Sequence, residues 1–260
     1  MRHVSPEIPS TNPAGGEPLE RWQGTALVVG CGGIGQALLQ ALQTRAPALQ
    51  LVGSRRSGNS TPLPAGVRPV ALDLTDDASL AALAPQLADL PPLRLVINTA
   101  GLLHDGPLQP EKRLSRLNRE HLERSFAVNA YGPVLLAQAL DPLLERSLPL
   151  HFASLSARVG SIGDNQLGGW YAYRAAKAAQ NQLLRTLAIE WRRRLPEACV
   201  CLLHPGTTAT ALSEPFQAGV PEDKLFSAER AAGHLLDVVA SLAPEQSGGF
   251  WAWDGQPIPW

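Results

Sequence analysis

The stretch Thr25-Ala-Leu-Val-Val-Gly-Cys-Gly-Gly-Ile-Gly35 decides the fold of this chain. Its aliphatic and β-branched start predicts a buried strand over 25–29, and helical spacing follows over 34–44. The glycines between them form a GxGxxG pattern. Glycines at a strand–helix turn let backbone N–H groups approach a pyrophosphate, which the helix N-terminus stabilises. The stretch therefore predicts a dinucleotide site, and a glycine-rich turn without a ligand is the plainer alternative.

Apolar runs of strand length alternate with helical stretches along the rest of the chain. Further strands are predicted over 49–52, 67–72, 93–97, 148–154, 198–203 and 248–253, and helices over 77–87, 118–140, 171–195 and 227–242. Pro133 predicts a kink or break in the helical stretch over 118–140. Such alternation implies parallel strands joined by right-handed crossovers, with helices on both faces. We expect the α/β class: one doubly wound, Rossmann-type domain over 24–260 with about seven parallel strands, after a flexible extension over 1–23.

The bulk composition excludes several classes of function. The 260 residues are 45% hydrophobic and 17% charged with a net charge of -1, which is typical of a soluble globular protein and favours no nucleic acid or membrane partner. The run 192–194 is interpreted as a solvated helix end. The cysteines Cys31, Cys199 and Cys201 form no CxxC pair, so we expect neither disulfides nor a metal site. No apolar stretch reaches the length of a membrane span and no signal peptide is recognised, so we expect a cytoplasmic protein.

The end of the second predicted strand bears on the choice of cofactor. A site that prefers NAD places a carboxylate there, about 20 residues after the glycine turn, for the ribose 2′-hydroxyl. Here the residues are Gly53-Ser54-Arg55-Arg56, which offer a hydroxyl and two guanidinium groups suited to a 2′-phosphate. We therefore expect NADP(H) rather than NAD(H). The alternative is that the arginines merely begin a solvated loop.

Tyr173 and Lys177 are the candidate catalytic pair. They lie four residues apart in the predicted helix over 171–195, so both side chains share one helix face. A lysine ammonium beside a phenol lowers the phenol pKa from its usual value of about 10 and makes it a workable general acid or base. The spacing alone is also compatible with a solvated helix face. Tyr171 lacks such a partner because its fourth neighbour is Ala175.

Taken together, these features resemble the short-chain dehydrogenase/reductase family from about residue 25 to 260. The motifs occur in the family's order: the glycine turn, Asp73-Leu74, Asn98-Thr-Ala-Gly101, Asn129, the Tyr173–Lys177 pair and Pro205-Gly206. Within the family, the chain is most similar to the branch of C-factor and Sniffer-like carbonyl reductases. That similarity lies in the segments 156–162, 168–174, 204–206 and 253–260.

The resemblance implies an NADPH-dependent oxidoreductase that reduces a small carbonyl compound to an alcohol by hydride transfer. Tyr173 would be the general acid–base, Lys177 would also hold the nicotinamide ribose, and Asn129 would hold a water in a proton relay. Asp73 would accept from the adenine amine. The implied cofactor site comprises Gly30, Gly32, Gly33, Ile34, Gly35, Ser54, Arg55, Asp73, Leu74, Asn98, Ala100, Gly101, Tyr173, Lys177, Pro205 and Gly206. A homodimer or homotetramer would form through the helices over 119–140 and 171–195.

The chain departs from the family pattern at several positions. Its glycine turn is one residue shorter, and Val29 stands where threonine is common. Ala157 falls on the commoner position of the catalytic serine, so we expect Ser156 to orient the carbonyl, with Ser154 and Ser161 less favoured. Thr99 replaces the second asparagine of the common NNAG motif. These departures keep open a different class of function: a C-factor-like cell–cell signalling protein that binds NAD(P) with weak or dispensable catalysis. A structural module ranks last.

Three further features have two interpretations each. The segment 207–226, with Phe216 and Phe226 among prolines and glycines, is either a substrate lid or an ordinary surface loop. His104 either touches substrate or is a loop histidine. Trp251, Trp253 and Trp260 are expected to pack the C-terminal strand and tail rather than bind a partner. Aliphatic, aromatic and pterin-like carbonyl substrates all remain open.

Overall fold

A seven-stranded parallel sheet forms the centre of the computed structural model, which describes residues 17–56 and 62–260. The strand order is β3-β2-β1-β4-β5-β6-β9. The strands are β1 (Gly24–Val29), β2 (Leu49–Arg55), β3 (Arg68–Ala71), β4 (Leu93–Asn98), β5 (Leu150–Leu155), β6 (Ala198–His204) and β9 (Gly249–Ala252). The predicted fold class is confirmed, as are all seven strands.

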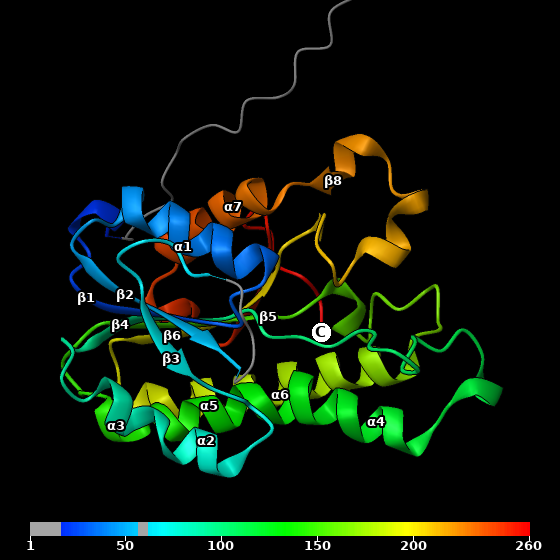
Figure 1. The fold of residues 1–260 in the computed structure, drawn as a ribbon, viewed down its shortest axis with the longest axis horizontal. Helices are drawn as coiled ribbons and strands as arrows, with labels where there is room; N and C mark the ends of the chain where they lie inside the picture. Colours follow the sequence, from blue (N-terminus) through cyan, green and yellow to red (C-terminus); the bar gives the residue numbers. More distant parts are fainter. Residues whose placement is uncertain (1–16, 57–61) are drawn as a thin grey trace, which may run out of the picture.

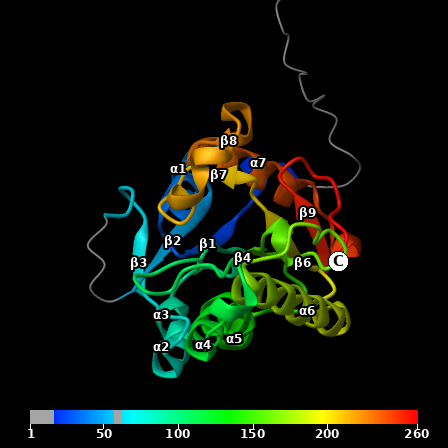
Figure 2. The ribbon, with the colours of Figure 1, turned by 90° about the vertical axis from the view of Figure 1, so that its right-hand side faces the viewer.

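Helices cover both faces of the sheet, as Figures 1 and 2 show. The helices α1 (Gly33–Arg45) and α7 (Ala228–Ser241) pack on one face. On the other face lie α2 (Asp77–Ala81), α3 (Leu83–Leu87), α4 (Arg119–Phe126), α5 (Gly132–Leu140) and α6 (Tyr171–Arg194). Neighbouring strand residues point to opposite faces, so Val28 joins the core under α1 and α7 while Leu27 joins the core under α5 and α6.

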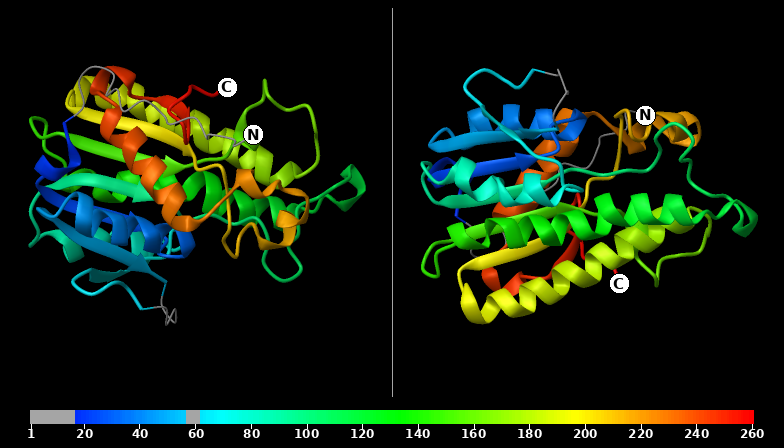
Figure 3. Two further views of the ribbon diagram at one scale, coloured as in Figure 1. Left: turned by 90° about the horizontal axis from the view of Figure 1, so that it is seen from above. Right: turned by 60° about the horizontal axis from the view of Figure 1, so that its bottom comes forward.

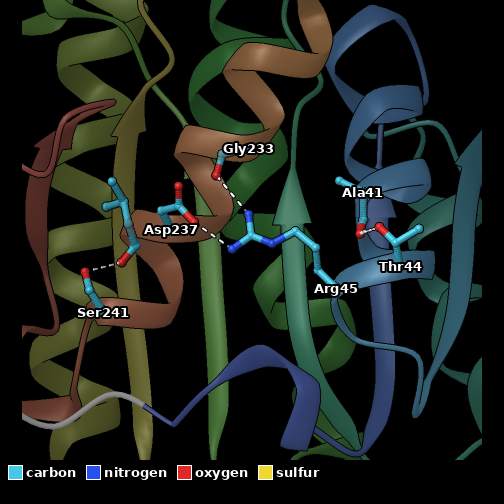
Figure 4. A network of polar contacts seen from close by, with 7 residues as sticks. Ala41, Thr44, Arg45, Gly233, Asp237 and Ser241 are labelled. Atoms are coloured by element: carbon cyan, nitrogen blue, oxygen red, sulfur yellow. Dashed lines mark hydrogen bonds and ion pairs between the residues drawn. The ribbon is translucent and has the colours of Figure 1, made fainter. Parts of the chain in front are cut away.

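The pairing of α1 with α7 is fastened at its surface by one arginine. Arg45, at the end of α1, donates to the Gly233 carbonyl at 3.2 Å and to the Asp237 carboxylate at 2.6 Å (Figure 4). Both acceptors belong to α7. Because these groups are largely exposed, the contribution of this ion pair to stability is small, on the order of 0–1 kcal/mol. The apolar contact between the helices therefore carries most of the packing.

Two of the predicted helices are interrupted. The stretch predicted over 118–140 consists of α4, a π-helical turn η3 (Ala127–Tyr131) and α5. Pro133 lies in the first turn of α5, where a proline costs no hydrogen bond, so the interruption is the π turn just before it. The stretch predicted over 77–87 likewise divides into α2 and α3 at Ala82.

The predicted flexible extension over 1–23 is wrong for its last residues. Residues 1–16 lie outside the described part of the chain, but 17–23 pack against the sheet. Trp22 is 1% exposed, stacks on His151 at 4.8 Å, and has the Arg94 guanidinium 3.7 Å from its ring centroid. Composition rich in proline and glycine gave no sign of this anchor, which depends on partners in β4 and β5.

The segment 207–226 lies beyond the carboxyl ends of the strands, as both views in Figure 3 show. Two short strands, β7 (Thr207–Thr208) and β8 (Leu225–Phe226), pair in parallel at its base. Short 3₁₀ helices occur in it and elsewhere: η1 (Leu19–Arg21), η2 (Leu114–Arg116), η4 (Asp141–Leu143), η5 (Arg158–Gly160), η6 (Glu214–Gly219), η7 (Glu222–Lys224) and η8 (Pro244–Gln246). The segment 207–226 is thus a folded insertion at the carboxyl ends of the strands, where doubly wound proteins bind ligands.

Candidate active site

The glycine turn is tight on its sheet side and open on its outer side. Gly30 has φ +84°, and a Cβ there would lie 2.7 Å from the Ala100 nitrogen. A Cβ on Gly35 would lie 2.5 Å from the Gly30 oxygen. At Gly32, by contrast, an added Cβ would meet no atom of the described residues within 4 Å. The turn is therefore open at Gly32, just before α1, and this geometry fits a pyrophosphate.

Two hydroxyl groups hold this turn from behind. The Thr99 hydroxyl donates to the Gly30 carbonyl at 2.5 Å and lies 3.0 Å from the Val29 carbonyl. Ser54 Oγ accepts from the Gly30 N–H at 3.1 Å, and the side chain is 2% exposed. The expectation that Ser54 would contact a 2′-phosphate stays a prediction, and in this structure its hydroxyl is buried in the support of the turn. Thr99 supplies the fixing hydroxyl that Val29 lacks.

A positive edge flanked by a carboxylate remains at the end of β2. Arg55 is half-buried and Arg56 is exposed. Nearby, Asp73 Oδ1 accepts from the hydroxyl and the N–H of Thr75, at 2.7 and 2.9 Å. The Thr75 hydrogen bonds, and to a smaller extent the charge of Arg56, lower the pKa of Asp73. Asp73 is thus held ionised beside the arginines.

Asn98 and Asn129 shape the segment after β4. Asn98 Oδ1 accepts from the Ala100 N–H at 3.1 Å. Asn129, in the π turn η3, accepts from the Leu102 N–H at 2.9 Å and donates to the Leu102 carbonyl at 2.7 Å. Its amide also donates to Ser125 Oγ at 3.1 Å. A water relay from Asn129 would therefore use its main-chain carbonyl, because its side chain fixes the segment 98–102.

Tyr173 and Lys177 both lie on the buried face of α6, so the alternative of a solvated helix face is wrong. Tyr173 is 9% and Lys177 2% exposed, with the Lys177 nitrogen 5.8 Å from the tyrosine ring centroid. The ammonium donates to the Leu155 carbonyl at 2.7 Å and to Gln180 Oε1 at 2.9 Å. Since Leu155 ends β5, the pair sits at the carboxyl edge of the sheet.

The electrostatics of the pair differ from the expectation. Burial raises the pKa of Tyr173 and lowers the pKa of Lys177 to about 7. The expected lowering of the tyrosine pKa is therefore not what this geometry gives, because the hydrogen bonds of the lysine go to Leu155 and Gln180. Desolvation disfavours the charged form of each group and outweighs their mutual influence here.

The serine expected to orient the carbonyl is already engaged. Ser156 is buried and its hydroxyl donates to Asn181 Oδ1 at 2.6 Å, so that proton cannot also be donated to a substrate. Ser154 accepts from Asn98 and Gln180, and Ser161 accepts from the Asp164 N–H. The expected role of Ser156 in orienting a carbonyl stays a prediction, and in this structure its hydroxyl is bonded to Asn181. Ala157, which is half-buried, brings no hydroxyl in its place.

A row of three aromatic side chains begins beside Tyr173. Trp170 lies with its ring centroid 6.3 Å from Tyr173 and 5.1 Å from Phe216 of the segment 207–226. Phe216 in turn contacts the His104 ring at 5.9 Å, and His104 Nε2 lies 3.1 Å from the Ala211 carbonyl. We call Trp170, Phe216 and His104 the aromatic wall. It connects the segment 207–226 to Tyr173, which favours the lid interpretation.

Trp170 is held in a strained backbone conformation. Among the described residues it is the one non-glycine with positive φ, at 53°, and it follows two glycines in similar conformations. Its N–H donates to the Glu111 carbonyl at 2.5 Å. The buried Glu111 carboxylate also accepts from the Ala172 N–H in the first turn of α6. Strain of this kind concentrates at functional sites, and it fixes the indole beside Tyr173.

Other predicted residues take structural positions. A Cβ on Gly206 (φ +78°) would lie 2.6 Å from the Phe226 ring, so the Pro205-Gly206 turn packs directly beneath β8. Phe226 also contacts Trp253 at 4.8 Å, and Trp260 stacks on Phe250 at 5.8 Å, so the tryptophans pack the C-terminal region as expected. The cysteines are buried with free thiols.

Thr210, Gln180 and Asn181 were missed in the sequence. A Cβ on Gly33 would lie 2.8 Å from Thr210 Cγ2, so this threonine rests on the glycine turn. The position of Thr210 four residues after Gly206 was the available signal. Gln180 and Asn181 are two adjacent amides on the buried face of α6, and their burial could have been inferred from the spacing to Lys177.

Two further properties concern residues 17–56 and 62–260. In these ranges no group of three or more His, Cys, Asp or Glu side chains could hold a metal ion. Over the same ranges, no helix combines the length and apolar character needed to cross a membrane.

Comparison with known proteins decides the family. A model described as short chain dehydrogenase matches residues 24–220. The chain belongs to the short-chain dehydrogenase family. It is a family of oxidoreductases, and the expectation from the sequence is confirmed.

Named relatives place the short-chain dehydrogenase chain more closely. It is 32% identical over 192 residues to 1-hydroxy-2-glutathionyl-2-methyl-3-butene dehydrogenase of Rhodococcus sp. (strain AD45), covering 73% of this chain and 78% of that protein. It is 35% identical over 140 residues to C-signal of Myxococcus xanthus, covering 54% of this chain and 78% of that protein. Both the oxidoreductase and the signalling interpretation thus have a relative.

Solved structures confirm the fold. The carbonyl reductase Sniffer of D. melanogaster superposes with a TM-score of 0.75 at 23% identity, over 92% of this chain and all (100%) of that chain. An NADPH-bound carbonyl reductase from chicken fatty liver gives a TM-score of 0.79 at 23% identity with the same coverage. The chain is thus similar to C-signal in sequence and to Sniffer-like carbonyl reductases in fold.

Proposed function

We propose that this short-chain dehydrogenase reduces small carbonyl compounds to alcohols with NADPH, using Tyr173 as the general acid. The observation that carries the proposal is the placement of Tyr173 and Lys177. They lie side by side at the carboxyl end of β5, on the sheet edge that also holds the open glycine turn. In doubly wound sheets this edge is where dinucleotides bind.

The residues present suit NADPH. The N–H groups of Gly32 and Gly33 at the start of α1 would hold the pyrophosphate, and Arg55 and Arg56 would hold the 2′-phosphate. Asp73 would accept from the adenine amine. When bound, NADPH supplies the hydride for the carbonyl carbon. The bound NADPH of the chicken carbonyl reductase supports this choice by similarity of fold.

Burial of Tyr173 suits reduction better than oxidation. Because burial raises its pKa, the phenol stays protonated at neutral pH and can donate to the alkoxide that develops on the substrate oxygen. Lys177, with a pKa lowered to about 7, is divided between its charged and neutral forms near neutral pH. Small changes around Lys177 would therefore alter the charge beside the phenol.

The aromatic wall indicates the kind of substrate. With Ser156 engaged and Ala157 bare, Tyr173 is the hydrogen-bond donor left to hold the carbonyl. Trp170 and Phe216 then supply flat apolar contact next to it. We therefore propose carbonyl compounds that carry a planar apolar group, which would lie against the Trp170 ring.

The test is NADPH oxidation against a panel of aromatic and short aliphatic aldehydes and ketones. We expect turnover with NADPH, weaker binding of NADH, and loss of turnover in Tyr173→Phe with NADPH affinity unchanged. Turnover that persists in Tyr173→Phe would contradict the assigned role. Tighter binding of NADH than of NADPH would contradict the cofactor assignment.

A second function is favoured by one specific observation. The three candidate serine hydroxyls are all used inside the fold, and C-signal is among the relatives. A signalling protein that binds NAD(P) with dispensable catalysis would show tight NADPH binding and no turnover on any carbonyl. The same panel therefore separates the two functions.

We also propose a cytoplasmic homodimer or homotetramer. The helices of the expected interface expose Tyr131 in η3, and Tyr171 and Ile189 in α6. Apolar side chains of this size are suited to burial between subunits. Sedimentation of the purified protein tests this, and a monomer at micromolar concentration would contradict it.

A further inference from the structure

A chain of buried polar side chains links β4, β5 and α6 beneath Tyr173. Asn98 and Gln180 both donate to Ser154 Oγ, at 3.0 and 2.9 Å, and Gln180 accepts from Lys177 at 2.9 Å. All four side chains are buried. Buried polar groups are costly unless every one is hydrogen-bonded, and a fully connected set fixes its members in one arrangement. This chain ends on the proposed catalytic lysine.

The orientation of the Gln180 amide follows from its neighbours. Its Nε2 lies 3.2 Å from the Leu155 carbonyl, which can only accept a hydrogen bond. The amide nitrogen must therefore face Leu155, and the amide oxygen faces Lys177. The same Leu155 carbonyl accepts from the lysine at 2.7 Å. The lysine nitrogen is thus held between two fixed oxygens.

We propose that Gln180 is a positioning residue: it fixes the Lys177 nitrogen beside Tyr173 and sets how strongly that nitrogen holds its proton. The inference rests on the proposed role of the Tyr173–Lys177 pair. Two of the three donor positions of the ammonium are occupied, and the third is left for the cofactor ribose. Because Asn98 also fixes the Ala100 N–H, the same chain connects the lysine to the segment expected under the adenosine ribose.

The charges around Lys177 leave the amide oxygen as the deciding group. Burial lowers the lysine pKa to about 7. An acceptor at hydrogen-bond distance favours the charged form and opposes that effect. Tyr173 on the same helix is the ionisable neighbour that faces the lysine, and its own raised pKa keeps it neutral.

Among the described residues, the charged groups of the elements packed on α6 are paired or exposed. Arg158 of η5 pairs with Asp164 at 3.0 Å near the surface. Burial lowers the pKa of His204, at the end of β6, to about 4 and keeps that imidazole neutral. On α4, Glu123 is exposed and Arg124 pairs with Asp105. In β5 the groups that bond to Lys177 and Gln180 are the Leu155 carbonyl and Ser154, which do not titrate.

The lysine content of the chain allows a direct measurement. The sequence has three lysines, Lys112, Lys177 and Lys224, and the other two are exposed. Protein labelled with ¹³C at the lysine ε-carbon gives one NMR signal for each, and Lys177→Met identifies the signal of Lys177. We expect the signal of Lys177 to titrate several units below the usual lysine value of about 10.4.

Two substitutions at Gln180 should move that titration in opposite directions. Gln180→Met keeps the size of the side chain and removes the oxygen, so the Lys177 pKa should fall by about one unit. Gln180→Glu places a negative charge beside the ammonium and should raise it by about one unit or more. Ser154→Ala loosens the amide from the other side and should give a smaller fall.

Asn181→Leu is the matched control. Asn181 is the neighbouring buried amide of α6, but it bonds to Ser156 and Gly160 rather than to Lys177. The variant should lower the melting temperature as Gln180→Met does, while the Lys177 titration stays in place. Gln180 variants that move the titration no further than Asn181→Leu would overturn the proposal.

The titration needs no substrate, so it is independent of the proposed function. If the protein reduces carbonyls, the pH profile of kcat/KM should also follow the lysine, moving down in Gln180→Met and up in Gln180→Glu. A fixed profile in both variants would overturn the role of Gln180 in the reaction. If no carbonyl is turned over, the reductase proposal fails, and an opposite shift of the two titrations still supports the control of Lys177 by Gln180.

Discussion

The cofactor side and the catalytic side of the candidate site are built from different chemical groups. On the cofactor side, the β1–α1 turn consists of backbone groups and glycines, with Thr99 and Ser54 behind them. On the catalytic side, buried side chains of β4, β5 and α6 form one connected polar chain that ends at Lys177. The cofactor side therefore depends on open space for a ligand, and the catalytic side depends on hydrogen-bond partners inside the fold. Substitutions should therefore act in different ways on the two sides.

The largest effect is expected at the proton donor on the catalytic side. Tyr173→Phe removes the hydroxyl that we propose protonates the alkoxide, and general acid catalysis is worth about 10²–10⁴-fold in rate. We expect a loss of that size in kcat on the best carbonyl of the panel, with the NADPH dissociation constant unchanged. Stopped-flow or steady-state NADPH oxidation, with fluorescence binding as the control, measures both. A loss confined to NADPH affinity would place Tyr173 on the cofactor side instead.

Substitutions at two glycines on the cofactor side should separate an effect on stability from an effect on NADPH binding. Gly35→Ala places a Cβ 2.5 Å from the Gly30 carbonyl and should lower the free energy of unfolding by about 1–3 kcal/mol. Gly32→Ala meets no atom of the described residues within 4 Å, so it should leave stability unchanged while its methyl group enters the space of the pyrophosphate. We expect urea unfolding to distinguish the first variant and NADPH binding to distinguish the second. If Gly32→Ala binds NADPH like the wild type, the pyrophosphate does not lie there.

Arg55 at the end of β2 and Arg56 just after it should decide between NADPH and NADH. Charge-assisted hydrogen bonds contribute about 1.5–3 kcal/mol, so Arg55→Ala with Arg56→Ala should weaken NADPH binding roughly 10- to 100-fold. NADH, which lacks the 2′-phosphate, should bind as before. Titration calorimetry with both nucleotides checks this. An equal loss for both nucleotides would show that the arginines act on the fold or on a shared part of the cofactor.

The sequence predicted the cofactor side and the catalytic side of the site to different extents. The fold, all seven strands and the glycine turn were predicted, because apolar periodicity and glycine spacing are local properties of the chain. The Tyr173–Lys177 pair was also found, since i and i+4 residues meet on any helix. The hydrogen bonds of Ser54 and Ser156 could not be predicted, because each partner lies far away in sequence. Ser54 bonds to Gly30, and Ser156 bonds to Asn181.

The same reason explains the remaining errors. Trp22 was assigned to a flexible extension although it stacks on His151, more than a hundred residues further along the chain. The direction of the Tyr173 pKa was wrong because burial cannot be read from the spacing to Lys177 alone. Motif recognition thus located the chemistry, and only the folded structure gave its environment.

The aromatic wall offers a more modest effect that bears on substrate choice. Phe216→Ala removes a ring that contacts Trp170, and such aromatic contacts are worth about 0.5–1.5 kcal/mol. We expect KM to rise up to about tenfold for aromatic aldehydes and to stay within twofold for short aliphatic ones. An equal rise for both classes would assign Phe216 to the general closure of the site.

A last effect leaves activity aside and concerns acid stability, on the side of the sheet away from the site. Burial lowers the pKa of His151 from 6.5 to about 4, so the unfolded chain binds its proton more readily than the folded one. The contribution of His151 is present above pH 6.5 and is lost as the pH falls toward 4. His151→Gln retains partners for Arg94 and Leu242 without titrating, and should lose about 1–2 kcal/mol less than the wild type between pH 7 and pH 5. Parallel acid losses in urea unfolding would contradict this origin.

The central claim is that Tyr173, with Lys177 beside it, donates a proton to a carbonyl substrate next to bound NADPH. The most direct measurement is kcat for NADPH-dependent reduction by the wild type and by Tyr173→Phe, under saturating cofactor. The account predicts measurable turnover in the wild type and about 10²–10⁴-fold less in the variant at the same NADPH affinity. Equal turnover in the two proteins, or none in the wild type despite tight NADPH binding, would contradict it.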